Sequence, residues 1–389
     1  MCADPAKALH VLTLTPFFPS DLNDVGGCFV ADPIEELRNL GMNSTVIAVS
    51  PLHNRRRRAV SSAPAEWVRY FQFPGTLGLS SAGKTVYARL AGPVGRIHRD
   101  HPINVIHAHA TLPCGYAAML LSQSLKIPFV VTVHGLDVLN TCSRGGAPAA
   151  WRRTASLKVY AAARTVICIS RRVEEMLKAA TRSDTHSLIV HNGVNPNFFS
   201  PNQEEGEQKA PEILAVGSLL PSKGHDLVLR AVAKLRPSFG ELHCRIIGEG
   251  PDGARLQSMA RESGIEKQVQ FAGRQSRLQV AEAMRRCSVF VLPSRNEALG
   301  CVYLEAMSCG KPVIGCRGQG IADVIEHGKN GWLIPPDGLD ELVAAISTLL
   351  KSHELRARIE AAARRTILEK LTLSSQAQRL AAAYREALA

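Results

Sequence analysis

The chain has 389 residues, which is long enough for two domains of ordinary size, each with its own apolar core. Apolar residues make up 46% of the chain and aromatic residues 5%, a composition that is typical of globular proteins and excludes a disordered or fibrous one. No apolar run approaches the length that spans a bilayer, and residues 1–7 lack the layout of a signal peptide, so we expect a cytoplasmic protein.

In the first half, short apolar strands alternate with helical stretches, which is the pattern of a parallel sheet with crossover helices. The predicted strands cover residues 10–14, 44–49, 105–109, 129–133 and 165–169. A helix is predicted over residues 32–41. Residues 51–81 are less regular, and the order of elements there stays open.

The second half repeats the alternation. Its predicted strands are residues 213–216, 243–247, 269–271 and 288–292, and its predicted helices are residues 224–235, 253–263, 279–286 and 301–308. Residues 201–211 contain too little apolar material to be buried, so they are predicted to link a domain of residues 1–200 to a domain of residues 212–373. The alanine-rich residues 374–389 predict an amphipathic helix.

This pattern predicts an α/β fold of two Rossmann-like, doubly wound domains that face a cleft. Ligands of open α/β sheets bind outside the carboxyl ends of the strands, so we expect the functional residues there. The ten cysteines are scattered without a CxxC pair, and no histidine pair has metal-ligand spacing. Neither a metal site nor a disulfide framework is expected.

Residues 291–316 are the most informative segment, because they combine an apolar strand, a glycine turn and a helix start. The backbone N–H groups at that helix start would hold a diphosphate without any side-chain charge; they belong to Leu299, Gly300 and Cys301. Glu297 precedes this anion site, and Glu305 lies about one turn into the helix. The segment therefore predicts a sugar-nucleotide site.

The spacing of these two glutamates carries little information by itself, because two other glutamate pairs in the chain have the same separation. Only Glu297 and Glu305 bracket a strand-to-helix phosphate loop. In that context the segment resembles the E-x7-E signature of retaining nucleotide-sugar glycosyltransferases of family 4, which have the two-domain GT-B fold. The resemblance covers nearly all of the chain and is strongest over residues 213–336. It implies that the last helix crosses back to the first domain.

In the second half, the resemblance implies a donor site. Residues 216–224 are similar to the family's donor element, which has an arginine directly after its first glycine and a lysine before its last. Lys223 matches that lysine and would neutralise the diphosphate. Ser218 replaces the arginine, and Arg274 is a candidate to substitute for it. Gly248 belongs to a turn that resembles the one lining the family's nucleotide pocket.

In the first half, the resemblance implies contacts with the transferred sugar and the acceptor. Gly26 and Gly27 match a glycine pair that faces the donor's diphosphate or the acceptor. The sequence TVHGLD resembles a family element whose histidine, here His134, lies beside the transferred sugar, and Asp137 would orient that histidine or bind the acceptor. His109 is a candidate acceptor contact, with a hydrogen-bonded interior histidine as the alternative.

The resemblance implies a retaining transferase that moves a hexose from a UDP-sugar, favoured over a GDP-sugar, to a lipid-linked or polysaccharide acceptor. Glu297, His134 and Lys223 would be its catalytic residues. No cofactor is expected, and the absence of a DxD triplet indicates a metal-independent reaction. The alternatives are a sugar-nucleotide epimerase or phosphorylase on the same fold, and a non-catalytic donor-binding membrane scaffold.

Positive charge is concentrated in the first half. Residues 1–200 hold 21 Lys and Arg against 12 Asp and Glu, so they carry +9 of the net +12. The run 55–58 is four arginines, and residues 144–164 interleave basic side chains with Trp151 and Tyr160. A solvated basic face is one interpretation; the other is attachment to the inner, anionic face of the cell membrane. No nucleic-acid module is recognised, so nucleic acid is not an expected partner.

Overall fold

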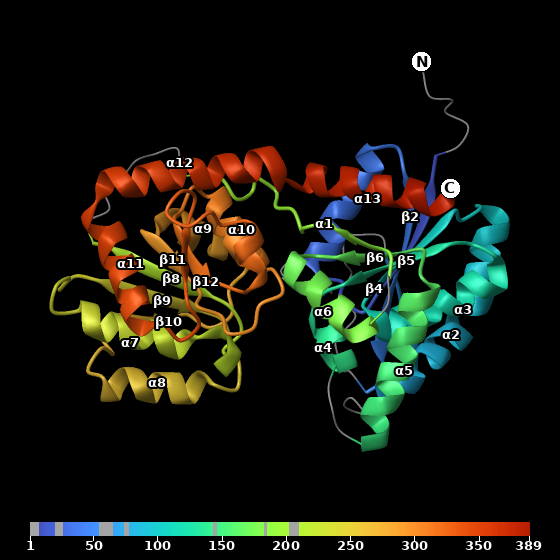
Figure 1. Ribbon diagram of the computed structural model, residues 1–389, viewed down its shortest axis with the longest axis horizontal. Coiled ribbons are helices and arrows are strands. Elements are labelled where there is room, and N and C mark those ends of the chain that lie inside the picture. Colours follow the sequence, from blue (N-terminus) through green and yellow to red (C-terminus); the bar gives the residue numbers. More distant parts are fainter. Residues whose placement is uncertain are drawn as a thin grey trace, which may run out of the picture. The chain divides into compact units, whose positions relative to one another are not determined.

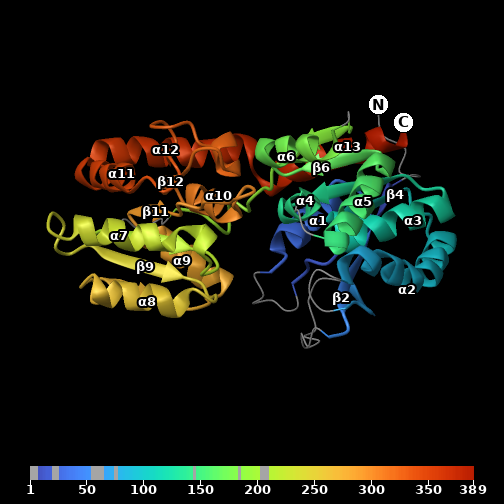
Figure 2. The same cartoon turned by 60° about the horizontal axis from the view of Figure 1, so that its bottom comes forward.

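The computed structural model describes residues 8–19, 26–53, 65–73, 78–142, 146–182, 185–201 and 210–389. The chain divides into two compact units, the first comprising residues 1–192 and 373–389 and the second residues 193–372. In each unit a parallel sheet carries helices on both of its faces (Figures 1 and 2).

The first sheet has the strand order β3-β2-β1-β4-β5-β6-β7, and its strands pair in parallel. The strands are β1 (His10–Thr15), β2 (Asn43–Pro51), β3 (Ala65–Tyr70), β4 (Val105–His109), β5 (Phe129–Val133), β6 (Thr165–Cys168) and β7 (Ser187–Ile189). The helices are α1 (Cys28–Asn39), α2 (Leu79–Asp100), α3 (Tyr116–Leu125), α4 (Leu136–Cys142), α5 (Gly146–Ala162), α6 (Arg171–Thr181) and α13 (Leu373–Leu388), and a π-helical turn spans Thr111–Gly115.

The second sheet has the strand order β10-β9-β8-β11-β12-β13, again with parallel pairing. The strands are β8 (Glu212–Val216), β9 (His243–Ile247), β10 (Val269–Phe271), β11 (Val289–Val291), β12 (Val313–Cys316) and β13 (Trp332–Ile334). The helices are α7 (His225–Leu235), α8 (Gly253–Glu262), α9 (Arg277–Arg286), α10 (Cys301–Ser308), α11 (Leu339–Lys351) and α12 (His353–Lys370), with 3-10 turns at Pro221–Lys223 and Gly320–Asp323.

Apolar side chains on both faces of each sheet explain why helices cover both faces. In the first unit, α1 and α13 pack on the face formed by Val11, Val105 and Val130, while α2, α3 and α5 lie on the opposite face (Figures 1 and 2). In the second unit, α7, α8 and α11 pack against β8, β9 and β11 in one continuous core. The strands β4, β5 and β11 between these helix layers are buried along their whole length.

Several elements differ from the sequence-based expectation or are missing from it, and α1 and α2 are two of them. Helix α1 begins at Cys28 and not at residue 32, because Gly27 adopts φ 90° and turns the chain into the helix early. The 22-residue helix α2 is not among the predicted elements, although it bears a buried stripe four residues apart. The members of that stripe are Ala82, Val86, Leu90 and Val94.

The boundary between the units lies at Asn192–Gly193. The residues that follow are held to the second unit by hydrogen bonds. The Val194 N–H donates to the Leu371 carbonyl at 2.9 Å. The Arg364 guanidinium donates to the carbonyls of Pro196 at 2.9 Å and Phe199 at 3.0 Å. Residues 202–209, most of the predicted linker, lie outside the described residues.

Candidate active site

In the second unit, the strand order reverses between β8 and β11, and the loops after these two strands carry Lys223 and Glu297. The Lys223 ammonium donates to Glu297 Oε2 at 2.6 Å, and the two side chains are 22% and 12% exposed. The Ser294 hydroxyl also donates to Glu297 Oε2, at 3.4 Å. The structure therefore brings together two of the three predicted catalytic residues at the point where open α/β sheets bind ligands.

Glycines allow the loops on this side of the sheet to approach one another. Gly224 ends the turn that carries Lys223 with φ 75°, and a Cβ atom there would overlap the Pro293 carbonyl. A Cβ atom on Gly320 would overlap the Ala298 carbonyl. Since no other residue fits without displacing the neighbouring backbone, the loop geometry depends on these glycines.

The start of helix α10 has the geometry expected of an anion site. Gly300 adopts φ 83°, and a Cβ atom there would lie 2.6 Å from the Tyr303 ring. Among the described residues, the N–H groups of Leu299 and Gly300 have no hydrogen-bond acceptor. The Leu299 side chain is fully buried, Cys301 is the first helical residue, and Glu305 is half-buried on the same helix. That this helix start binds a diphosphate stays a prediction.

Three further predicted donor residues lie at the ends of neighbouring strands. Ser218 is exposed directly after β8. Gly248 follows β9 with φ 147°, and a Cβ atom there would overlap the Gly217 carbonyl, so this glycine has a packing reason of its own. Arg274 is exposed after β10, and its backbone N–H lies 3.4 Å from Glu249 Oε1. A phosphate contact by Arg274 in place of the missing arginine stays a prediction.

In the first unit, the predicted residues Gly27 and His134 both lie next to phenylalanine residues. The strand order reverses between β1 and β4, and Phe17 follows β1. A Cβ atom on Gly27 would lie 2.6 Å from the Phe18 nitrogen, which explains the second glycine of the pair; Gly26 precedes it in the same turn. The His134 ring packs against Phe29 at 4.9 Å and Phe17 at 5.5 Å between centroids.

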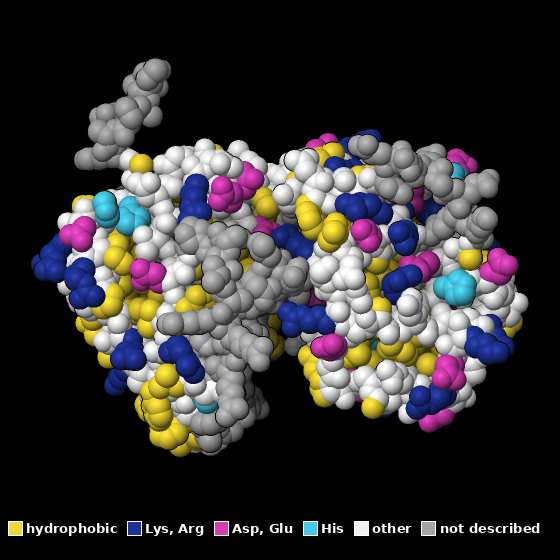
Figure 3. Space-filling model, turned by 180° about the vertical axis from the view of Figure 1, so that it is seen from behind, with side chains coloured by type: hydrophobic (Ala, Val, Ile, Leu, Met, Phe, Trp, Pro, Cys, Tyr) yellow, Lys and Arg dark blue, Asp and Glu magenta, His cyan; other side chains and the backbone are white. Residues whose placement is uncertain are grey.

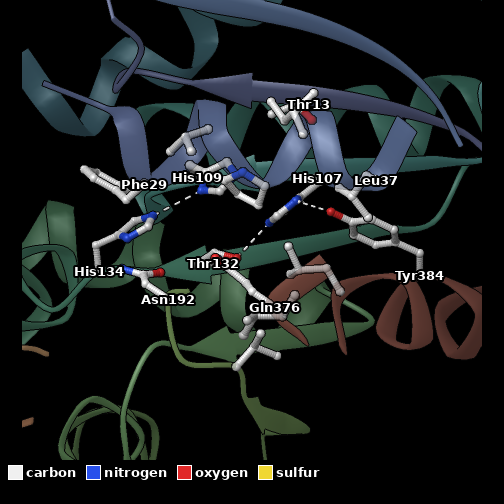
Figure 4. A pocket seen from close by; sticks show the side chains of 16 residues that line it. Thr13, Phe29, Leu37, His107, His109, Thr132, His134, Asn192, Gln376 and Tyr384 are labelled. Carbon is white, nitrogen blue, oxygen red and sulfur yellow. Dashed lines mark hydrogen bonds between the residues drawn. The ribbon is translucent and has the colours of Figure 1, made fainter. Parts of the chain in front are cut away.

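Three histidines, including His134, line a pocket of the first unit where α1 and α13 cover the sheet (Figure 4). His109 Nδ1 lies 3.1 Å from His134 Nε2. His107 Nδ1 lies 2.7 Å from the Tyr384 hydroxyl, and His107 Nε2 lies 2.7 Å from the Thr132 hydroxyl. His109 is thus hydrogen bonded inside the protein, as its alternative interpretation predicts. Sequence reasoning did not find the partnership of His107 with Tyr384.

The three rings are held in the neutral form. Burial lowers the pKa of His107 to about 3 and that of His134 to about 4. Burial, and then the neighbouring His107 and His134, hold the pKa of His109 well below its usual value. A neutral His134 can accept or donate a hydrogen bond at a substrate hydroxyl without adding charge.

The Asp137 carboxylate holds the loop that carries His134 in place through hydrogen bonds. Its carboxylate accepts hydrogen bonds from the backbone N–H groups of His134 at 3.0 Å, Val138 at 3.2 Å and Thr111 at 3.4 Å. Burial raises the pKa of this carboxyl to about 6 despite these hydrogen bonds. The contacts fit the predicted orienting role, and contact of Asp137 with an acceptor stays a prediction.

The basic stretch at residues 144–164 differs from its predicted form. Tyr160 is 2% exposed and accepts a hydrogen bond from the Thr111 hydroxyl at 2.8 Å, so the prediction of a surface residue is wrong for this side chain. Arg152 is also buried, whereas Trp151 is 53% exposed. Residues 55–58 and Arg144 lie outside the described residues. On the face shown in Figure 3, Lys and Arg side chains are scattered among Asp and Glu.

Over the described ranges, no group of three or more His, Cys, Asp or Glu side chains is placed to bind a metal ion. In the same part of the chain, no helix is both long enough and apolar enough to cross a bilayer.

Two parallel α/β units, each with polar side chains at the reversal point of its sheet, agree with the two-domain GT-B fold that the resemblance implies. A sucrose-phosphate synthase from Thermosynechococcus elongatus has a similar fold, with a TM-score of 0.79 at 18% identity over 97% of this chain and 98% of that one. An Anabaena protein, HepE, solved in complex with UDP, gives 0.73 at 19% identity over 97% of this chain and 100% of its own. The predicted fold of two Rossmann-like domains is confirmed; the cleft between them stays a prediction.

Family models give the particular family. Residues 29–198 match "Glycosyltransferase Family 4", and residues 198–366 match "Glycosyl transferases group 1". An uncharacterized glycosyltransferase of Methanocaldococcus jannaschii is 30% identical over 256 residues, 65% of this chain and 67% of its own. A D-inositol 3-phosphate glycosyltransferase of Mycobacterium marinum is 29% identical over 313 residues, 76% of this chain but 64% of its own. The chain belongs to the group 1, family 4 glycosyltransferases, as the resemblance predicts.

Proposed function

We propose that this protein is a retaining, metal-independent hexosyltransferase that moves a hexose from a UDP-sugar to a lipid-linked or polysaccharide acceptor. The observation that carries the proposal is the Lys223–Glu297 pair, at 2.6 Å, on the two loops that flank the reversal point of the second sheet. That point is where doubly wound sheets bind nucleotides.

Lys223 is suited to the leaving group. An ammonium has three hydrogen-bond donors, so Lys223 can keep its contact with Glu297 while it donates to the diphosphate of a donor. Together with the N–H groups of Leu299 and Gly300, it would stabilise the charge that develops as the bond between the sugar and the diphosphate breaks. The absence of a DxD triplet from the sequence is the reason for proposing that no metal ion assists.

Glu297 is suited to the sugar. Its carboxylate accepts from Lys223 and Ser294 through Oε2, and its backbone N–H donates to Gln319 Oε1 at 2.8 Å, so the residue is held from both sides. We assign it to the donor sugar's hydroxyls, where its charge also favours an oxocarbenium-like transition state. Glu305 would hydrogen-bond the ribose diol.

His134 is proposed to contact the transferred sugar and the acceptor hydroxyl. It is half-buried at the carboxyl end of β5, with one edge against Phe17 and Phe29 and its Nε2 atom on His109. Its neutral state, with a pKa of about 4, fits a hydrogen-bonding residue better than a cation. In same-face attack the departing phosphate takes the acceptor's proton, so this mechanism asks for no base from the protein.

The names of similar proteins favour this substrate class. A structure of similar fold was solved with UDP, and a relative is named for transfer to D-inositol 3-phosphate. A second relative, from Mycolicibacterium smegmatis, is named as dependent on GDP-mannose. A UDP-sugar is therefore our first choice and a GDP-sugar the second.

The test is a thermal-shift panel of UDP-, GDP- and ADP-sugars followed by a transfer assay. A donor that binds only the folded protein raises the melting temperature, by an amount set by its concentration relative to Kd. Release of UDP that requires an added glycan or lipid-linked fraction would support transfer. Sugar interconversion without acceptor would favour the epimerase alternative, and UDP-sugar binding with no turnover in any fraction would favour the scaffold.

Attachment to an anionic membrane surface is the second part of the proposal. It rests on the excess of basic residues in the first half and on the exposed Trp151 of α5. Sedimentation with anionic vesicles should fall as salt rises. Binding that is unchanged when Arg55 to Arg58 are all replaced by serine would exclude that run as the attachment point.

A further inference from the structure

We propose that Arg295 is a positioning residue that holds the Lys223 and Glu297 loops in register, so that donor binding by Lys223 depends on it. The inference rests on the proposed function, because it concerns the same donor site. Its carrying observation is that one guanidinium joins three loops at the carboxyl edge of the second sheet, those after β8, β11 and β13.

The first connection runs to the β8 loop and to the first turn of α7, which follows it. Arg295 binds the Asp226 carboxylate with two hydrogen bonds, Nη1 to Oδ1 at 2.8 Å and Nη2 to Oδ2 at 2.9 Å. Its Nη1 atom also donates to the Pro221 carbonyl at 2.6 Å, and its backbone N–H donates to the Ser222 carbonyl at 2.8 Å. These contacts lie on both sides of Lys223 in the sequence, at Pro221, Ser222 and Asp226. Arg295 therefore holds the turn that carries this lysine.

The second connection runs to the β13 loop. Arg295 Nε donates to Asp337 Oδ1 at 2.7 Å, and Asp337 adopts φ 59°, a conformation that L-residues seldom adopt. Arg295 itself lies two residues before Glu297 in the β11 loop. Each hydrogen-bonding edge of the planar guanidinium is therefore used, and Arg295 cannot shift without moving the backbone next to Glu297.

The charges around Arg295 indicate that this residue forms structural ion pairs and does not contact a phosphate. Arg295 is 28% exposed and stands between two carboxylates, of which Asp226 is 13% exposed. Burial alone would raise the pKa of Asp226, but its hydrogen bonds to Arg295 and then to Arg230 lower the value to about 2. Because the carboxylates of Asp226 and Asp337 neutralise its charge, Arg295 is not the missing arginine of the donor element. Its function is to place Lys223.

The mechanism of its effect follows from geometry. Lys223 reaches Glu297 from a short turn whose neighbours at Pro221 and Ser222 are hydrogen bonded to Arg295. Without the guanidinium, Lys223 would sample positions away from the diphosphate. A misplacement of about 1 Å in such a group can cost about 100-fold in rate. Lysine at position 295 could not restore the arrangement, because an ammonium cannot form the paired hydrogen bonds of a guanidinium.

The experiment is a double-mutant cycle on UDP affinity, measured by calorimetry with the full chain. We expect Arg295→Gln and Lys223→Met each to weaken UDP binding by at least about 10-fold, and the double variant to bind about as weakly as Lys223→Met alone. Losses that multiply in the double variant would show that Arg295 acts independently of Lys223 and would overturn the inference. Arg295→Lys should resemble Arg295→Gln, and full UDP affinity in Arg295→Lys would also overturn it.

Arg230→Gln is the matched control. Arg230 donates to the same Asp226 carboxylate at 2.7 Å but contacts neither the Pro221 nor the Ser222 carbonyl. We expect this variant to keep wild-type UDP affinity, whereas a loss equal to that of Arg295→Gln would contradict the assignment to Arg295. Melting curves of all variants identify any that fail to fold. The readout is UDP binding, so wild-type protein that binds UDP without transferring sugar would contradict the proposed function while leaving this inference testable.

Discussion

The Tyr384 hydroxyl lies 2.7 Å from the Nδ1 atom of His107, which joins the last helix of the chain to a central strand of the first sheet. Both residues are almost fully buried, and His107 uses its other ring nitrogen on Thr132. The polar interior beneath His134 is therefore closed by residues that lie 277 positions apart in the sequence.

Replacement of Tyr384 by phenylalanine should destabilise the first unit. The change leaves the buried Nδ1 atom of His107 without its partner, which costs about 1–3 kcal/mol. Denaturant unfolding, followed by far-ultraviolet circular dichroism, measures the loss. Tyr87→Phe is the control, since Tyr87 makes no hydrogen bond to any described residue. Equal unfolding midpoints for the two variants would contradict the prediction.

The buried histidines should make stability depend on pH. A histidine whose pKa is lower in the folded than in the unfolded protein does not weaken the fold at pH values above its unfolded pKa. As the pH falls below that pKa, the unfolded chain takes up a proton that the folded protein does not, so the stability decreases. For His107, with a folded pKa of about 3, the loss begins near pH 6.5 and amounts to about 2 kcal/mol at pH 5.

His107→Gln tests this dependence, because glutamine takes up no proton. The variant should be less stable than wild type at pH 7.5 but should lose about 2 kcal/mol less between pH 7.5 and pH 5. Asp137, whose pKa is raised to about 6, acts in the opposite direction in this range, but it is present in both proteins and cancels in the comparison. Parallel stability curves for wild type and variant would contradict the assignment.

The Lys223–Glu297 pair should matter for activity far more than for stability. Lys223→Met is expected to lower kcat/KM for the donor by about 100- to 1000-fold, the usual cost of removing one donor that stabilises a transition state. Lys234→Met removes an ion pair of similar length, 2.7 Å to Asp340, that is far more exposed, so it should keep full activity. Similar activity losses in both variants would contradict the prediction, because they would show that the loss of any positive charge has this effect.

Close backbone contact at Gly320 predicts a sensitive position. Gly320→Ala would place a methyl group on the Ala298 carbonyl, so it should lower stability by more than about 1 kcal/mol and also reduce donor affinity by moving Leu299 and its neighbours. Gly95→Ala, in helix α2 with nothing within 4 Å of the new Cβ, should instead stabilise by up to about 1 kcal/mol. Melting temperatures of the two variants that shift in the same direction would refute the packing argument.

The sequence predicts the buried strands better than the other elements. Strands such as β4 and β5 are continuous apolar runs bounded by polar or turn residues, and their predicted ends agree with the structure. Helix α2 escapes prediction, because its three glycines and Pro93 weaken the helical signal that its buried stripe provides. Propensity and pattern point in different directions there, and packing against the sheet decides.

For the site, sequence identifies residues but not their partners. Lys223 and Glu297 stand 74 positions apart, and nothing local in either loop indicates that they form an ion pair. The same holds for Arg295, whose three loops are brought together only by the order of the strands. By contrast, Gly300 could be placed from sequence alone, because a strand, a turn and a helix start define its position within a few residues.

The first unit contains residues 1–192 and the chain's last helix, α13, whose 16 residues contribute to the core that covers β1 and β4. During synthesis the ribosome completes the whole of the second unit before it makes that helix. The part of the first unit that is made earlier therefore has one face of its sheet incompletely covered until α13 has been synthesised. We expect nascent chains that lack α13 to need chaperones more than chains that contain it, and a truncation that removes α13 to destabilise the fold of residues 1–192.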